Sequence, residues 1–429
     1  MQKSLYLFLV LFGISVDCSC QEADSIFINL LKQNSFSIRS SELGAADDDL
    51  EFLKDLLKDK RIVSMGEATH GTKQFAQLKC RFFKFLVENL HFNIIAMEAD
   101  FGVTMEINDY VLGINDNGRG ALRKLLFFHC VNEETWQLIE WIRLHNKKFK
   151  QKQVKIYGID FQFGDGQLDR IKEYFSKVDT IFLKEIGKYN EQPSEGFYGP
   201  SLAIEHITMI RGRLREDSVR YISTSGLREW EKALHLTHTL EDFHFLRQRR
   251  INRDLCMKRN IDWILEHEGS NSKMLVWAHN QHVMYDSVMT ANGYMKVMGL
   301  FLKDSYRHEL YTIGFDFNKG RFLANKPTIL GKKVLTVYNI ANAPPGTLAS
   351  TLSQVPFSMF FIDNANASKN KVIKNKWKGS VLMRSIGGLI PEECVIEQSC
   401  SFISLPLLKA YDGLIFVNET LEVTRLKEM

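Results

Sequence analysis

A repeated alternation of short apolar runs and long amphipathic stretches is the feature that most restricts the fold of this sequence. The short runs are rich in Ile, Val, Phe and Met. Such runs predict strands, and the amphipathic stretches between them predict helices packed on a mostly parallel sheet. We therefore expect an α/β fold with a mostly parallel central sheet flanked by helices. The predicted strands are 61–67, 93–99, 154–160, 273–280, 310–317, 358–364 and 413–419.

The distribution of these signals also predicts how the chain is organised. Segments 73–90 and 132–149 have apolar residues at helical spacing. Between about residues 165 and 266 the strand signal disappears, and charged, Leu-rich segments such as "LREWEKALHLTHTLEDFHFLRQRR" replace it, so we expect a helical insertion or lid there. The predicted parts are a signal peptide at 1–20, a first part of an α/β catalytic domain at 21–164, the helical insertion at 165–266, and a second part of the catalytic domain at 267–429.

The first twenty residues, "MQKSLYLFLVLFGISVDCSC", have the pattern of a secretory signal. A lysine near the start precedes an apolar run from Leu5 to Val16, which is shorter than the ~20 residues that span a bilayer. We expect an exported protein, periplasmic or secreted. Lipid attachment at Cys18 or Cys20 is an open alternative. No later segment has the pattern of a transmembrane helix.

Net charge and cysteine content argue against two classes of function. The formal charge of +4 is small for 429 residues and the basic residues are scattered, so no nucleic-acid-binding surface is predicted. Beyond the signal, only Cys394 and Cys400 are close in sequence, and in an exported protein they either bridge or remain idle thiols. The absence of paired CxxC motifs argues against a zinc site made of cysteines.

Charged and imidazole side chains stand at the ends of four predicted strands. Because the carboxyl ends of parallel strands line a common crevice, we expect these side chains to form one site. For Asp160 the simpler role of a helix N-cap stays open. The residues are Glu67 with His70, Glu98, Asp160, and His279 with His282.

The residue types at this predicted site restrict its chemistry. The chain has no GxSxG, HExxH or Walker motif, which argues against a common serine hydrolase. A histidine takes a proton near neutral pH, and a carboxylate bonded to its other nitrogen fixes the tautomer, so such a pair can activate water directly. Two histidines with two or three carboxylates can also bind a divalent metal, and composition does not separate these cases.

Three more histidines, His235, His238 and His244, follow one another at spacings of three and six residues. A solvated cluster on one helix face explains them better than a metal site does, because no carboxylate or cysteine completes a ligand motif.

The sequence resembles the erythromycin esterase family of macrolide-inactivating and related hydrolases. The resemblance covers nearly all of the chain after about residue 60, with the order and spacing of the motifs intact. The similar segments are "GEATHGT" (66–72), "LKCRFFKFLVENLHFNIIAMEAD" (78–100), "IYGID" (156–160), "NRDLCMKRN" (252–260), "VWAHNQHV" (276–283), "APPGTLASTL" and "YDGLIFVNET".

The resemblance implies hydrolysis of an ester, in the best-known members the lactone of fourteen-membered macrolides such as erythromycin, which inactivates the drug and confers macrolide resistance. It implies that His70 is the base that activates water, oriented by Glu67 or Glu98. Negative charge on the carbonyl oxygen would be met by His279 or His282, by an arginine, or by loop amides. The residues expected to be catalytic are His70, Glu67, Glu98, His279, His282 and Arg81, and those expected to bind substrate are Lys79, Asp160, Arg253 and Asn280.

The expected partners are water and a small-molecule macrolide or other ester, and no cofactor is expected. A macrolide is large, amphipathic and carries a basic amino sugar, so its pocket should be broad, apolar and rimmed with acids. One alternative is a metal-dependent hydrolase in which the clustered histidines and carboxylates hold a divalent metal. Another is an exported protein that binds haem or a macrocycle without turning it over.

Overall fold

The computed structural model describes residues 25–125, 127–188, 191–192, 201–290, 293–328 and 333–427. The predicted signal peptide, with Cys18 and Cys20, lies outside these residues.

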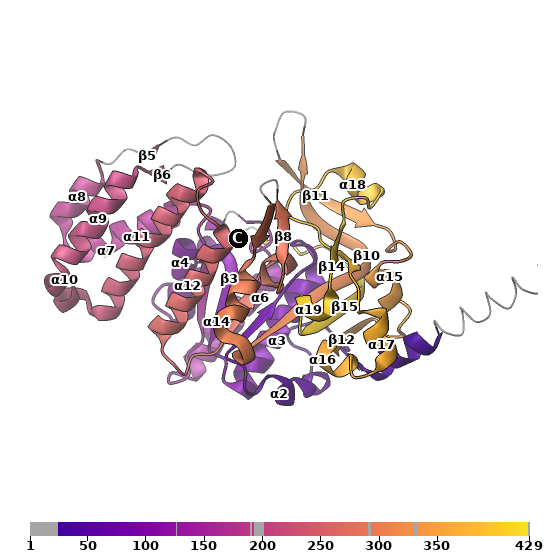
Figure 1. Cartoon of the computed structure of the whole chain (residues 1–429). Helices are drawn as coiled ribbons and strands as arrows, with labels where there is room; N and C mark the ends of the chain where they lie inside the picture. Colours follow the sequence, from indigo (N-terminus) through magenta and orange to yellow (C-terminus); the bar gives the residue numbers. More distant parts are fainter. Residues whose placement is uncertain are drawn as a thin grey trace, which may run out of the picture.

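A nine-stranded, mostly parallel sheet forms the centre of the protein (Figure 1). Its strands follow the order β1-β12-β15-β10-β2-β7-β3-β4, and β11 pairs with β10 outside this path. The pairs from β15 to β4 are all parallel, whereas β1, β12 and β11 pair antiparallel. The predicted α/β class with a mostly parallel central sheet is confirmed. The bounds are β1 Ser35–Ser37, β2 Ile62–Met65, β3 Ile94–Asp100, β4 Lys155–Asp160, β7 Met274–Trp277, β10 Leu310–Pro327, β11 Lys333–Ile340, β12 Met359–Asp363 and β15 Gly413–Thr420.

Helices cover both faces of this sheet because successive strand residues point to opposite sides. In β2, Ile62 packs in one core cluster with α12 (Arg253–Glu268) and α14 (Met298–Tyr306). Its neighbour Val63 packs in the other cluster with α3 (Lys73–Leu90) and α6 (Glu133–Lys148). The central strands are therefore buried on both faces, as their continuous apolar sequences indicate.

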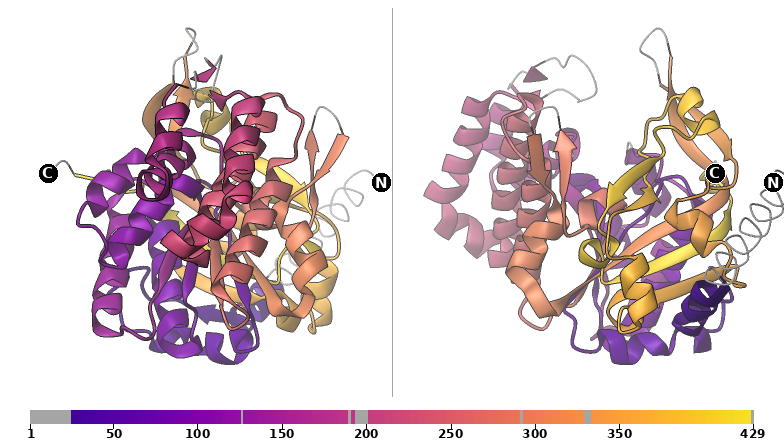
Figure 2. Two further views of the ribbon diagram at one scale, coloured as in Figure 1. Left: turned by 90° about the vertical axis from the view of Figure 1, so that its left-hand side faces the viewer. Right: turned by 45° about the vertical axis from the view of Figure 1, so that its right-hand side comes forward.

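A group of helices lies at the end of the sheet formed by β4, in the region predicted to be a helical insertion (Figures 1 and 2). The group contains one short strand pair, β5 (Glu191–Gln192) with β6 (Ser201–Leu202), that the sequence did not indicate. The domain boundaries themselves stay a prediction. The helices are α7 Asp165–Val178, α8 Thr180–Ile186, α9 Ile204–Glu216, α10 Ser218–Ser225 and α11 Leu227–Arg247.

The C-terminal part of the chain covers the opposite end of the sheet (Figure 2). There, Cys394 and Cys400 are joined by a disulfide. Of the cysteines that the structure describes, Cys80, Cys130 and Cys256 are free and buried. None of the helices in the described ranges combines the length and apolarity needed to cross a bilayer.

Arg81, expected to be catalytic, makes structural contacts from α3. Its side chain is fully buried and reaches the segment 40–49 that precedes the first parallel strand. It donates to the carbonyl of Ser40 at 2.6 Å and to the carbonyl of Ala46, and it pairs with the carboxylates of Asp47 and Asp49. These acceptors use all three guanidinium nitrogens, which gives Arg81 a structural role in the fold, and its expected part in the reaction stays a prediction.

Replacing Arg81 with Met is expected to lower the free energy of unfolding by about 3–5 kcal/mol, because a carboxylate is left buried without its cation. Arg39→Met is the matched control: Arg39 pairs with Asp48 of the same segment but its side chain is 60% exposed and its charge is screened by solvent, so little change in stability is expected. Chemical denaturation measures both. Loss of turnover in a fully stable Arg81→Met variant would support the expected catalytic role.

Candidate active site

The predicted site residues meet where β2, β7 and β3 end. These strands are in register, with Met65 opposite Trp277 and Trp277 opposite Met97, so the residues that follow them lie at one level. Gly66 allows the turn after β2 to approach α13 (Asn280–Val283), since a Cβ atom at position 66 would lie 2.1 Å from Oδ1 of Asn280.

Asn280, expected to bind substrate, holds this turn against the sheet. Its side chain is buried, donates to the carbonyl of Phe315 at 2.7 Å and accepts from the Phe315 amide at 3.0 Å. Its own amide donates to the carbonyl of Glu67 at 3.0 Å. These bonds give Asn280 a structural role, and its expected contact with substrate stays a prediction.

His70 and Glu67 form the central pair of the site. Nδ1 of His70 lies 2.6 Å from Oε1 of Glu67. The other carboxylate oxygen of Glu67 accepts from Nε1 of Trp277 at 3.0 Å and pairs with the ammonium of Lys79. Because a carboxylate only accepts, Nδ1 of His70 carries the proton and Nε2 keeps its lone pair when the ring is neutral.

Glu67 remains charged although it is buried. Burial alone would raise its pKa, but the nearby Lys79 ammonium and the hydrogen bond from His70 outweigh burial and lower the pKa to about 2. Glu67 is therefore a carboxylate over the whole physiological range, and it orients the imidazole of His70.

Lys79, expected to bind substrate, lies beneath Glu67 and does not reach solvent. Its side chain is fully buried and its ammonium lies 4.7 Å from the centre of the Trp277 ring. Burial lowers the pKa of Lys79, and the Glu67 carboxylate acts in the opposite direction. Its place in the structure is that of counter-ion to Glu67, and its expected contact with substrate stays a prediction.

Glu98 organises a second cluster. One oxygen of Glu98 accepts from the backbone amide of His279 at 2.9 Å, and the other accepts from Arg253 at 2.8 Å. The Arg253 guanidinium is also bound by both oxygens of Asp160, at 3.0 and 2.7 Å. Although burial would raise the pKa of Glu98, His282 and Arg253 hold it well below its usual value.

Asp160 is fully buried, and its expected contact with substrate stays a prediction. Its bidentate bond to Arg253 shows that it orients the guanidinium, and one oxygen also accepts from the amide of Phe161 at 2.8 Å.

His282 lies beside Arg253. Its Nδ1 is 2.8 Å from Oδ1 of Asp254, and its Nε2 is 3.4 Å from Oε1 of Glu98 and 3.1 Å from Nη1 of Arg253. Burial lowers the pKa of His282, but the carboxylates of Asp254 and Glu98 outweigh burial and raise it. His282 is thus the histidine of this cluster that most readily carries a positive charge.

His279 has both ring nitrogens committed. Its Nε2 lies 3.2 Å from the carbonyl of Ile386, which can only accept, and its Nδ1 accepts from the amide of Gln281 at 3.3 Å. Burial and the neighbouring His70 lower the pKa of His279 to about 3, so the ring stays neutral. His279 has no N–H left to stabilise a carbonyl oxygen, which removes it from the candidates for that role.

His129 is a member of the site that the sequence did not reveal. Its ring stacks on His70, with centroids 4.4 Å apart and planes inclined by 22°, and the ring of His279 lies 4.9 Å from His70. His129 belongs to the irregular segment between α5 (Gly118–Lys124) and α6 and follows no strand. The available signal is a histidine next to two phenylalanines just before Asn132, which caps α6.

Three side chains of the site are partly open to solvent. His70 is 11% exposed, and Arg253 and His282 are each 19% exposed. Glu67 and Glu98, by contrast, are buried. The open surface therefore combines one imidazole that can accept a proton with the Arg253 guanidinium, which can donate to an anion, and the His282 ring beside it.

The residues proposed as metal ligands have their donor atoms engaged in other bonds. Both oxygens of Glu67 and both oxygens of Glu98 accept hydrogen bonds from protein donors, and Nδ1 of His70 donates to Glu67. Within the ranges that the structure describes, no three His, Cys, Asp or Glu side chains are arranged to hold a metal ion. The histidines of α11 are also separate from such a site, since His235 contacts Asn260 at 3.0 Å and stacks on Trp263.

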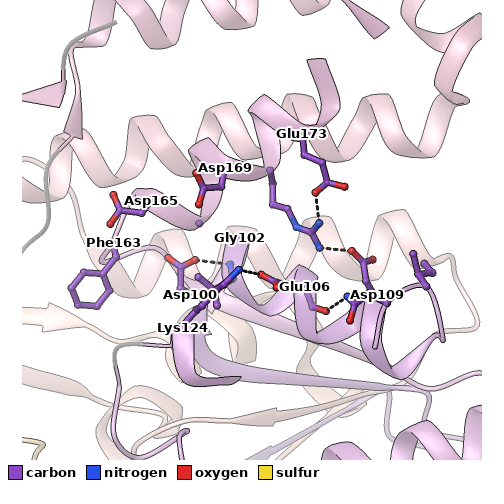
Figure 3. A pocket seen from close by; sticks show the side chains of 14 residues that line it. Asp100, Gly102, Glu106, Asp109, Lys124, Phe163, Asp165, Asp169 and Glu173 are labelled. Atoms are coloured by element: carbon purple, nitrogen blue, oxygen red, sulfur yellow. Dashed lines mark hydrogen bonds and ion pairs between the residues drawn. The ribbon is translucent and has the colours of Figure 1, made fainter. Parts of the chain in front are cut away.

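An acidic pocket adjoins this site between α4 (Phe101–Val111) and α7 (Figure 3). Its volume is about 650 Å³. The ring of Phe163 on its wall contacts Phe127, and Phe127 in turn contacts His129. Burial raises the pKa of Asp100, which lies two residues after Glu98, to about 7. The charged residues of the lining are Asp100, Glu106, Asp109, Lys124, Asp165, Asp169, Arg170 and Glu173.

Two solved structures share the fold. A protein from Bacillus cereus superposes with a TM-score of 0.77 at 21% identity, covering 94% of this chain and 99% of that one. A mutant of the erythromycin esterase EreC in its open conformation has a TM-score of 0.62 at 14% identity, covering 92% of this chain and 100% of that one. At these identities the similarity shows the fold alone.

Sequence comparison identifies the family. YbfO of Bacillus subtilis strain 168, provisionally named a hydrolase, is 22% identical over 415 residues, which cover 87% of this chain and 86% of YbfO. Erythromycin esterase type II of Escherichia coli is 21% identical over 411 residues, which cover 87% of this chain and 93% of that protein. The erythromycin esterase family model matches residues 87–420. Because this match covers most of the chain, the protein belongs to the erythromycin esterase family.

Proposed function

We propose that this protein hydrolyses the lactone ester of a macrolide such as erythromycin, with His70 activating water. The proposal is carried by the hydrogen bonding of the two His70 ring nitrogens. The Nδ1–H of His70 is fixed on a buried, charged Glu67, while its Nε2 has no hydrogen-bond partner among the described residues. A ring held in this way accepts a proton at Nε2.

In the proposed reaction, Nε2 of His70 removes a proton from water as the water oxygen attacks the ester carbonyl carbon. The Glu67 carboxylate stabilises the imidazolium that forms. When the tetrahedral intermediate collapses, the bond from the carbonyl carbon to the alcohol oxygen breaks, and His70 returns the proton to that oxygen. This cleavage opens the macrolide ring, and the linear product carries a new carboxylic acid and a new alcohol.

Arg253 is the proposed donor to the carbonyl oxygen of the intermediate, and His282, whose ring nitrogens bind Asp254 and face Glu98 and Arg253, supports it from beside. Both are partly exposed, and both are fixed by buried carboxylates: Arg253 by Asp160 and Glu98, and His282 by Asp254. Donors fixed in advance need no reorganisation when negative charge develops, which is the usual source of their catalytic effect.

Two observations support a macrolide as substrate. A relative that aligns over most of this chain is named for erythromycin. The pocket beside the site is of a size suited to a small molecule, and five acidic side chains besides Asp100, whose pKa is about 7, against two cationic side chains give it a negative balance that suits an amino sugar. Export of the protein belongs to the same proposal, and the disulfide between Cys394 and Cys400 supports an oxidising compartment.

Incubation of the purified protein with erythromycin is expected to add the mass of one water to the drug. Mass spectrometry of the drug measures this directly. Binding without any change of mass, across a panel of macrolides, would contradict hydrolysis and favour a protein that captures its ligand.

The substitution His70→Asn is expected to reduce turnover by about 10² to 10⁴-fold because the general base is removed. The Asn amide can still donate to Glu67, so the melting temperature should change little. His308→Asn is the matched control, because His308 is exposed and lies just before β10, at the amino ends of the parallel strands, whereas the site lies at their carboxyl ends. Retention of most of the turnover in His70→Asn would refute the assigned base.

Exhaustive chelation is expected to leave the single-turnover rate unchanged, because the oxygens of Glu67 and Glu98 are engaged by protein donors. Metal analysis of the same sample verifies removal. A rate that falls on chelation and recovers when a divalent metal is added back would instead support the metal-dependent alternative.

A further inference from the structure

We propose that His129 is a positioning residue for His70: its neutral ring, stacked on the His70 imidazole, holds that ring in the orientation in which Nδ1 meets Glu67. The proposal rests on the proposed function, because that function gives His70 its role as base.

The ring of His129 lies nearly flat against the ring of His70. The planes of His129 and His70 are inclined by only 22° with centroids 4.4 Å apart, so one ring lies over the other. His279 contacts His70 as well, but with planes inclined by 47°. The hydrogen bond to Glu67 fixes one atom of the His70 ring, whereas a flat neighbour restricts rotation of the whole ring. Of these two contacts, His129 is therefore the one that sets the plane of the base.

The surroundings of His129 fix the orientation of its ring and keep it neutral. Its Nε2 lies 3.3 Å from the backbone carbonyl of Glu98. A carbonyl can only accept, so this contact places the proton on Nε2. Burial, and after it the charge that His70 can carry, lower the pKa of His129 to about 4, so the ring stays neutral near pH 7. A second positive charge 4.4 Å away would oppose protonation of His70 during the reaction, and a neutral ring avoids this.

Neighbouring residues of the same segment hold the backbone of His129 in place. Asn132 is fully buried and donates from its side chain to the carbonyl of His129 at 2.6 Å. The same side chain caps α6 by accepting from the amide of Thr135 at 2.7 Å. The amide of Cys130 donates to the carbonyl of Phe127 at 3.0 Å, which closes the turn around His129. His129 is thus attached to the start of a helix and to β3, both of which are rigid elements.

Two substitutions of His129 separate the effect of its ring stacking on His70 from the effect of its hydrogen bond to the Glu98 carbonyl. His129→Phe keeps a flat ring but cannot bond the Glu98 carbonyl, whereas His129→Gln keeps a donor but has no ring. His129→Leu provides a second ring-free variant if the Gln variant does not fold. The matched control is His145→Gln, since the ring of His145 contacts Trp141 and Phe149 near the end of α6, away from the site.

Turnover of erythromycin gives the first readout. The Phe variant should keep kcat within about threefold of the wild type, as expected when a stacked pair is preserved. The Gln or Leu variant should lose about 10- to 100-fold in kcat with little change in KM, because a misoriented base lowers the rate rather than binding. The His145→Gln control should be unchanged.

The second readout is the downfield proton resonance of the Nδ1–H to Glu67 hydrogen bond, recorded by NMR on the ligand-free protein. We expect it in the wild type and the Phe variant, and expect it to broaden or vanish in the Gln or Leu variant. This signal tests His129 even if erythromycin remains intact, which would count against the proposed function alone. Wild-type turnover and signal in a folded ring-free variant, or equal losses in the Phe and Gln variants, would overturn the role of the stack.

Discussion

The arrangement of the site depends on one buried ion pair, between Glu67 and Lys79. Burial by itself would favour the protonated form of Glu67, which is a weaker partner for an imidazole. The Lys79 ammonium reverses this preference and keeps the carboxylate charged. Through Oε2, Glu67 also joins the turn after β2 to α3 and to Trp277 at the end of β7, while Oε1 binds His70. The orientation of His70 therefore follows from contacts that hold the sheet and a helix together.

Glu98 plays the corresponding role for the other half of the site, with a different result. Its neutralising group is Arg253, which is partly exposed, whereas Lys79 is fully buried. The charges of Lys79 and Glu67 are buried and act only through His70, while the Arg253 guanidinium, paired with Glu98, reaches the surface together with His282. Two buried carboxylates of the same type thus produce a basic imidazole and a cationic donor group, because their environments differ. Hydrolysis by activated water requires both.

The sequence predicted the parts of this arrangement that depend on strand ends. Glu67, Glu98, Asp160 and His279 follow apolar runs, and parallel strands in register bring such positions together. The family pattern could not distinguish Lys79 from Arg81, which are two residues apart on α3 and so point about 200° apart around the helix axis. One reaches Glu67 and the other reaches the segment 40–49.

The structural contacts of Asn280 and the position of His129 could not be predicted from the sequence, for related reasons. A polar residue beside a catalytic one can serve the backbone, and Asn280 does so because the Phe315 backbone offers both a donor and an acceptor. His129 comes from an irregular segment, whose position depends on tertiary contacts such as the Asn132 side chain rather than on periodicity. Sequence patterns locate residues on regular elements, and they say little about loops that pack against them.

The distribution of charge around the site gives the proposed substrate a physical basis. Arg253, with His282 beside it, makes the open face of the catalytic cluster suited to an oxygen that gains negative charge. The adjoining pocket has the opposite character, although part of its acidity is offset locally: Arg170 binds Asp109 and Glu173, and Lys124 binds Glu106. Two cations still leave the five acidic side chains besides Asp100 in excess. A ligand with an ester at one end and an amine at the other matches this division, whereas an ester without a cationic group would use the catalytic cluster alone.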